Sequence, residues 1–262
     1  MDRQQIRQVA NVVTTLVVIV VNALANALPI NNQTTGEISD RYPVLFTPAG
    51  YIFSIWGLIY LGLIAFSVYQ AMPGRREAED SLLDRIGWFY VVSGLANAIW
   101  IFLWHYEVLP LSLLVMLVLL GSLIAIYLRL NVGRRVVNRR EFWAVHVPFS
   151  LYLGWITVAT VANVAVVLYD LGWGGFGISQ QAWTIIMLAV AAALAAANSV
   201  TRRDIAYNLV IVWAFSGIAV RQAATRSITV TVSLLLVVVV LALAASLTGG
   251  KQPAEVAPAL TR

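Results

Sequence analysis

Residues 110–131, PLSLLVMLVLLGSLIAIYLRLN, decide the fold, because this stretch carries no charged side chain before Arg129. A helix of about 20 apolar residues is long enough to cross a hydrocarbon core of about 30 Å. The whole chain has the same character: 60% of its 262 residues are hydrophobic and 11% are charged, whereas roughly a quarter of a soluble domain is charged. A membrane β-barrel would instead show alternating polarity. The sequence therefore predicts an all-α, polytopic transmembrane helix bundle.

Outward from this stretch, further apolar runs lie between charged residues or Pro and Gly breaks. Three of them admit another interpretation. The first run is also compatible with a signal peptide, and the last two are compatible with a re-entrant hairpin, since Arg221 and Arg226 lie at their turn. In total we expect eight spans, near residues 9–28, 50–72, 86–106, 110–131, 143–169, 182–200, 205–220 and 228–247.

The basic residues indicate an orientation. With a cytoplasmic N-terminus, all but three of the 17 basic residues fall on the cytoplasmic side, and Arg41, Arg221 and Arg226 fall outside. Cytoplasmic loops carry an excess of Lys and Arg. We therefore expect an integral protein of the bacterial plasma membrane, with both termini cytoplasmic and the lipid bilayer as its main partner. The net charge of +5 then reflects topology, and no nucleic-acid partner is expected.

This layout divides the chain into three regions. Residues 1–177 are expected to form a five-helix membrane domain, and residues 178–248 to add three further helices. Residues 249–262 contain two prolines and few large apolar side chains, so a disordered tail is expected there. The outside connection from Pro29 to Pro48 is longer than neighbouring helices need, and we interpret it as a lid.

Several kinds of chemistry are excluded. The chain has no cysteine, so disulfides and thiolate metal sites are impossible. Its two histidines, His105 and His146, are predicted at opposite ends of the membrane and so cannot hold one metal ion; His105 is expected to be solvated. No carboxylate lies at membrane depth, as a proton-coupled pump would require, and no paired acids or nucleophile with a base are found. We expect neither an enzyme nor an obligatory cofactor.

Polar and aromatic residues form stripes on three predicted helices. Residues at i, i+3 and i+7 share one helix face, and an asparagine amide at membrane depth must turn inward to find a partner. Plain helix packing explains the same spacing, so a ligand pocket and a packed interior both remain open at this point. The stripes are Phe53, Trp56 and Tyr60; Asn97, Trp100 and Trp104; and Tyr152, Trp155, Ala159 and Asn163.

The predicted topology places all three stripes in the outer half of the membrane, beneath the long first loop. An apolar cavity with aromatic walls and a few amide and indole donors suits a flat hydrophobic ligand. Four other tryptophans lie near predicted helix ends, where tryptophan commonly marks the membrane interface. These expected interfacial residues are Trp88, Trp143, Trp173 and Trp183.

Three segments resemble the tryptophan-rich sensory protein and translocator protein family, also called peripheral benzodiazepine receptors. Residues 46–60, FTPAGYIFSIWGLIY, are similar to that family's proline-bearing entry to its second helix. Residues 95–100, LANAIW, resemble its N-x-x-W on the third helix, and residues 155–163, WITVATVAN, its W-x-x-x-A-x-x-x-N on the fifth. The resemblance covers roughly residues 9–170. Two features depart from the pattern: Ala49 stands where a second proline is common, and the spans after residue 180 have no counterpart.

The resemblance implies a five-helix fold that binds porphyrin, haem or other planar hydrophobic molecules, with Trp56, Asn97, Trp155 and Ala159 facing the ligand. The expected function is thus a membrane receptor or carrier for tetrapyrrole-like ligands, with a regulatory role. Some family members have been suggested to break porphyrins down. The alternative is a structural or accessory subunit of a larger membrane complex, and a homodimer or another membrane protein is a compatible partner. The helices after residue 180 are expected to pack beside the bundle without contributing to the pocket.

Overall fold

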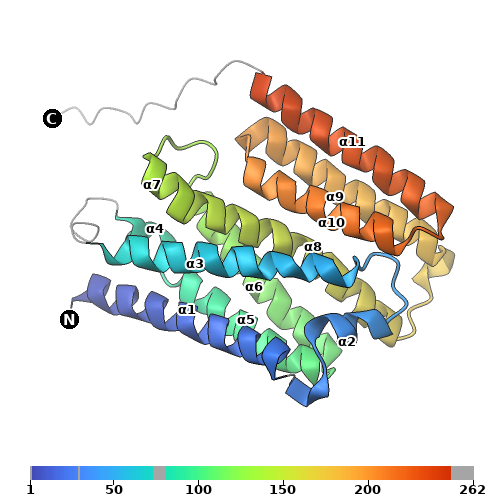
Figure 1. Ribbon diagram of the computed structural model, residues 1–262, viewed down its shortest axis with the longest axis horizontal. Coiled ribbons are helices and arrows are strands. Elements are labelled where there is room, and N and C mark those ends of the chain that lie inside the picture. The colour runs from blue at the N-terminus through green and yellow to red at the C-terminus, as the bar shows by residue number, and fades with distance from the viewer. Residues whose placement is uncertain (1, 29, 73–80, 249–262) are drawn as a thin grey trace.

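The computed structural model describes residues 2–28, 30–72 and 81–248, and within these residues it is helical without any strand. Long helices run side by side along one axis, antiparallel to their neighbours in sequence (Figure 1). The expected tail 249–262 lies outside the described residues. The helices that make the bundle are α1 (Arg3–Ala27), α3 (Ile55–Ala71), α5 (Phe89–His105), α6 (Leu109–Arg129), α8 (Val147–Asp170), α9 (Gln180–Arg202), α10 (Ile205–Arg221) and α11 (Arg226–Thr248).

Short elements complete this framework. The 3₁₀ turn η2 (Gly50–Ser54) leads into α3, and α4 (Leu82–Ile86) precedes α5. A short α7 (Arg139–Glu141) and the π-helical turn η3 (Phe142–His146) lead into α8, while η4 (Gly175–Gly177) lies between α8 and α9.

The eight predicted spans are all present as helices. Six helical segments in the described part of the chain are long and apolar enough to cross a membrane, and α5 and α10 are shorter apolar helices. The last two helices, α10 and α11, pack against each other; α11 is long enough to span a membrane, and α10 is one of the shorter apolar helices. The first helix is built into the bundle: Gly94 of α5 lies so close to Thr14 that an added Cβ would be 2.1 Å from its Cγ2.

The helices form two groups. α1, α3, α5, α6 and α8 make a five-helix core, and α9, α10 and α11 form a C-terminal layer beside α8 (Figure 1). α10 makes the main contact between them, and at Gly154 of α8 an added Cβ would lie 3.1 Å from the Tyr207 carbonyl oxygen. A small residue permits this close approach of two helices.

A buried carboxylate joins the two groups at one end. Asp204 caps the start of α10 by accepting from the Tyr207 amide at 3.2 Å. Its Oδ2 accepts from the Tyr127 hydroxyl of α6 at 2.7 Å and from the Ser150 hydroxyl of α8 at 2.6 Å. Asn198 of α9 donates to the same Tyr127 hydroxyl at 2.9 Å. Four helices therefore meet in one polar network, which fixes the C-terminal layer on the core.

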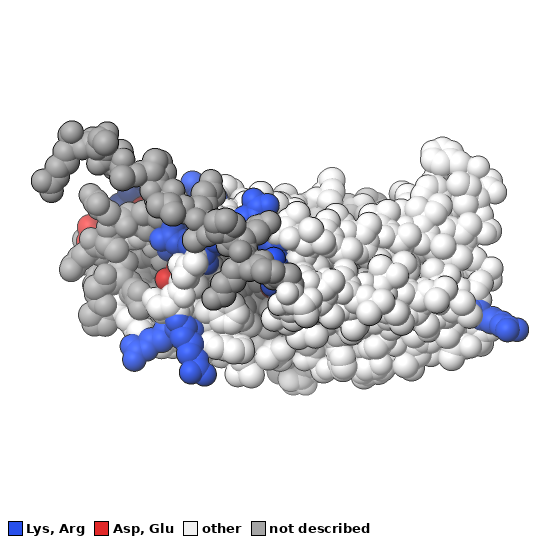
Figure 2. All heavy atoms as spheres, turned by 90° about the horizontal axis from the view of Figure 1, so that it is seen from above, with Lys and Arg blue, Asp and Glu red and all other residues white. Residues whose placement is uncertain are grey.

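Charge divides the bundle into two ends. Figure 2 shows Lys and Arg gathered over one end, and a long uncharged surface separates them from a basic residue at the other end. We call the first the arginine-rich end and the second the lid end, because residues 30–48 close it. Among described residues the lid end carries Arg41, Arg221 and Arg226.

Candidate ligand-binding site

The lid consists of residues 30–48 and includes η1 (Ile30–Asn32) and the short helix α2 (Thr35–Arg41). A capping box between Thr34 and Glu37 starts α2. The lid is held closely on α5: Trp104 Nε1 donates to the Thr35 carbonyl at 3.2 Å, and Asn31 Nδ2 donates to the His105 carbonyl at 3.1 Å. Ile38, Val44 and Phe46 of the lid are buried, so the predicted lid closes the bundle.

The C-terminal layer also holds the lid. The Gln180 amide donates to the Pro43 carbonyl at 2.8 Å, and Arg221 forms an ion pair with Asp40. The Ala49 amide donates to the Gly217 carbonyl at 3.2 Å. At Gly217 an added Cβ would lie 2.1 Å from the Ile52 side chain. The lid therefore contacts both helix groups. Glycine is required at position 217, where α10 meets Ile52 just after the lid.

A charged cluster fastens the outer edge of the lid. Glu107, in the turn after α5, accepts from the Tyr42 hydroxyl at 2.7 Å and pairs with Arg41 at 2.8 Å. The Tyr42 hydrogen bond, followed by Arg41, holds the pKa of the Glu107 carboxyl below its ordinary value. Burial, and then the same carboxylate, raises the pKa of Tyr42. Both residues thus remain in the protonation states that keep the lid closed at neutral pH.

Beneath the lid is a small cavity of about 40 Å³ between η2, α5 and α8. We call it the aromatic site. Trp100 and Trp104 stack with ring centroids 5.3 Å apart, and Trp100 Nε1 donates to Asn163 Oδ1 at 3.1 Å. Six of the nine predicted ligand-facing residues line this cavity together with lid residues such as Thr35 and Pro48; the six are Phe53, Trp100, Trp104, Trp155, Ala159 and Asn163.

The other three predicted residues do not line it. Trp56 stacks on Tyr60 at 5.5 Å and meets Trp155 edge-on at 6.1 Å, so these rings lie behind the wall of the aromatic site. Asn97 Oδ1 accepts from Asn22 Nδ2 of α1 at 2.7 Å. The Asn97 side chain therefore stabilises the contact between α1 and α5. The stripe pattern did not reveal Asn22 as its partner.

One buried donor of the aromatic site, the indole Nε1 of Trp155, has no hydrogen-bond partner. A buried donor without a partner costs about 1–3 kcal/mol. Trp155 lies on the wall of the aromatic site, so its indole N–H is available to an acceptor that enters there.

His105 differs from the sequence-based expectation. Its side chain is fully buried, and its Nδ1 lies 2.7 Å from the Ile101 carbonyl oxygen of its own helix. The prediction of a solvated histidine was wrong, because the lid covers the end of α5.

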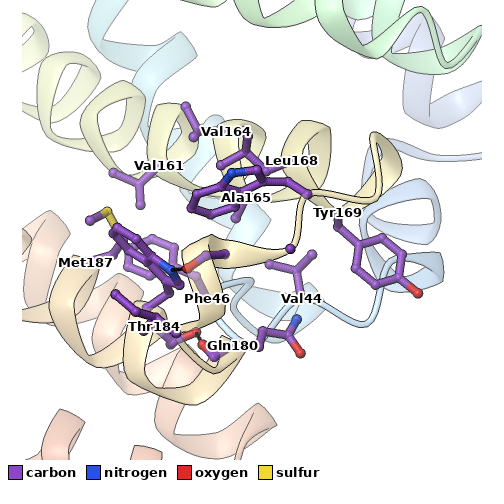
Figure 3. Close-up of a pocket in the computed structure, with 15 residues that line it drawn as sticks. Val44, Phe46, Val161, Val164, Ala165, Leu168, Tyr169, Gln180, Thr184 and Met187 are labelled. Atoms are coloured by element: carbon purple, nitrogen blue, oxygen red, sulfur yellow. Dashed lines mark hydrogen bonds between the residues drawn. The ribbon is translucent and has the colours of Figure 1, made fainter.

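A second and larger cavity, of about 480 Å³, lies on another face of α8 (Figure 3). We call it the α8–α9 cavity. Val161, Val164, Ala165 and Leu168 of α8 point into it from one side, and residues of α9 and the lid face them (Figure 3). Its remaining lining residues are Val44, Phe46, Tyr169, Trp173, Gly174, Gly175, Ile178, Gln180, Trp183, Thr184 and Met187.

The α8–α9 cavity adds to two expectations. Trp173 and Trp183, assigned to the membrane interface, also line this cavity, and Trp88 and Trp143 are exposed. The helices after residue 180 add nothing to the aromatic site, but α9 supplies one wall of the larger cavity. The i, i+3, i+4, i+7 spacing of the α8 residues was visible in the sequence. This spacing did not indicate a cavity, because all four side chains are small or aliphatic and would suit a lipid-facing surface equally well.

These features define an integral membrane helix bundle with an aromatic site beneath a closed lid. The chain matches the family of TSPO-like proteins over residues 8–246, and it belongs to that family. The matched region includes α9, α10 and α11, which the resemblance over residues 9–170 had left outside. Neither the curated proteins nor the solved structures give a match.

Proposed function

We propose that the protein is a membrane receptor or carrier that binds a planar hydrophobic molecule of the tetrapyrrole type in the aromatic site. The observation that carries this proposal is the buried, unpartnered indole N–H of Trp155 at the wall of that site. Flat ligands are held by stacking and edge contacts with aromatic rings and by a few placed polar groups. Phe53, Trp100 and Trp104 supply the rings, and Trp155 supplies a donor.

The size of the aromatic site adds a requirement. Small-molecule sites usually enclose about 300–1,000 Å³, and this cavity has about 40 Å³. A planar ligand therefore requires an open state in which the lid moves away from α5. The polar contacts that hold the lid, such as Trp104 to Thr35, would be broken in that state, so the observed affinity would include the cost of opening.

For the orientation we propose that both termini are cytoplasmic. The concentration of arginine at the end where α1 begins and α11 ends supports this, since the positive charge of membrane proteins is biased to the cytoplasmic side. The lid and both cavities would then face the outer leaflet.

A second candidate function is that of an accessory subunit. The closed aromatic site favours this function. So does α11, because only 22% of the residues in its apolar 18-residue window are buried within the chain. Its outer face presents Leu234, Val237, Val238 and Leu241. Such a face packs on lipid or on another membrane helix, and co-purification of a second membrane protein would favour the partner.

Protoporphyrin IX titration of the full chain in phosphatidylcholine nanodiscs tests the proposal. Binding is followed by the shift of the porphyrin absorption band, which does not depend on protein fluorescence. Trp155→Phe keeps a ring but removes the donor, so its affinity should fall by about 1 kcal/mol, roughly five-fold. Trp143→Phe, a change at an exposed tryptophan at the other end, is the matched control and should bind as the unaltered chain does. Equal affinity of all three proteins, or no saturable binding, would contradict the proposal.

A further inference from the structure

The α8–α9 cavity is separate from the aromatic site. The two share no lining residue, and α8 stands between them with one face toward each. Val161, Val164, Ala165 and Leu168 face the larger cavity, and Trp155, Val158, Ala159 and Val166 face the smaller one. Whatever occupies one does not thereby occupy the other.

We infer that the α8–α9 cavity is a second binding site, for an uncharged aromatic or polycyclic molecule that enters at the lid end. Its volume of about 480 Å³ lies within the usual range of small-molecule sites, about 300–1,000 Å³. It is present with the lid closed, so no opening step is required. This inference does not depend on the proposed porphyrin site.

The lining determines the class of ligand. None of its residues is charged, and a buried anion without a nearby cation is strongly unfavourable. An uncharged ligand is thereby favoured here. Four aromatic residues, Phe46, Tyr169, Trp173 and Trp183, line the cavity, which favours a ring-bearing molecule that stacks or makes edge contacts.

The aromatic wall is fixed before any ligand enters. Trp183 Nε1 donates to the Gly175 carbonyl at 2.9 Å, and the indole lies 5.3 Å from that of Trp173. Gly175 has φ of +64°, and an added Cβ would lie 3.3 Å from Trp183 Nε1. The turn between α8 and α9 thus holds the indole at the mouth of the cavity. A preformed wall reduces the entropy that binding must pay.

The polar groups at the mouth are few. Thr184 Oγ1 donates to the Gln180 backbone carbonyl at 2.9 Å. The side-chain Nε2 of Gln180 donates to the Pro43 carbonyl. These bonds leave the Gln180 side-chain oxygen as an acceptor beside the opening. A ligand with one hydroxyl or N–H and an apolar ring system would match this arrangement.

Benzophenone is a suitable probe, because it is uncharged, carries two rings and cross-links to nearby C–H bonds when irradiated. The full chain in phosphatidylcholine nanodiscs is irradiated over a range of benzophenone concentrations, and the adducts are located by peptide mass spectrometry. We expect saturable labelling centred on Met187, which lines the cavity. Leu194 of the same helix is 50% exposed and should be labelled in proportion to concentration without saturation.

Two cavity-filling variants, Ala165→Phe and Val164→Phe, should each abolish the saturable labelling at Met187. Val190→Phe, at an exposed position of α9, is the matched control and should retain it. Size-exclusion profiles show which variants are folded, and either filled variant suffices. Labelling of Met187 that does not saturate, or that survives in a folded filled variant, would overturn the inference and show that lipid chains occupy the space.

Discussion

The aromatic site and the α8–α9 cavity lie against two faces of one helix, yet they differ in size, polarity and closure. The aromatic site has about 40 Å³, contains Asn163 and three indoles, and is shut by the lid. The α8–α9 cavity has about 480 Å³, is lined mainly by apolar side chains and exists with the lid closed. The comparison teaches that the polar site is kept small by hydrogen bonds among its own residues, whereas the apolar one persists because α10 rather than α9 packs on α8.

The largest expected effect comes from the contact of α10 with Ile52, which lies just after the lid. Residues of the lid line both cavities. Gly217→Leu places side-chain atoms where Ile52 lies, and overpacking of this kind costs about 1–3 kcal/mol. We expect a lower thermal midpoint in detergent and faster proteolysis within residues 30–48. Gly121→Leu, at a position with nothing within 4 Å of the added Cβ, is the matched control. An unchanged midpoint in Gly217→Leu would show that the lid is not held by α10.

A smaller effect separates the aromatic site from the helix contact behind it. Asn97→Leu removes the hydrogen bond from Asn22, and such bonds contribute about 0.6–2 kcal/mol in membranes. Stability should fall by this amount while protoporphyrin affinity stays the same, because Asn97 does not line the cavity. The family resemblance implies the opposite, a loss of binding. If the protoporphyrin affinity of Asn97→Leu fell as far as that of Trp155→Phe, Asn97 would have to be counted among the ligand-binding residues.

The smallest effect concerns the charged edge of the lid. The folded-state pKa of Glu107 is below its ordinary value, so its contribution is present above the unfolded pKa and is lost as pH falls through the folded one. The protection factors of the amides of residues 35–45, which correct for the pH dependence of intrinsic exchange, should be constant from about pH 8 to pH 6 and should fall below about pH 4. Because the Glu107 ion pair is exposed to solvent, the change in protection is expected to be small. Glu107→Gln should show the lower protection factors already at pH 7, and a fall in acid equal to that of the unaltered chain would contradict this role.

The fold was predictable because membrane spans are encoded by length and hydropathy. All eight helices and the lid could be derived from the sequence, and so could the convergence of Trp100 and Asn163 on one interior space, since polar groups at membrane depth turn inward; that they bond to each other was not predicted. Asn97 shows the limit of this reasoning. Its partner is Asn22 on α1, and a stripe on one helix does not say which neighbour it faces. The α8–α9 cavity was not predictable, because it depends on where α9 is placed rather than on any residue type.

The central claim is that α8 separates two binding sites, and a crossed experiment tests it most directly. Ala159→Phe fills the aromatic site and Ala165→Phe fills the α8–α9 cavity; both alanines are half-buried on the same helix. Protoporphyrin IX titration and saturable benzophenone labelling of Met187 are measured for each folded variant. We predict that Ala159→Phe loses porphyrin binding and keeps the labelling, and that Ala165→Phe does the reverse. Loss of both activities in both variants, or loss of porphyrin binding in Ala165→Phe alone, would contradict the account.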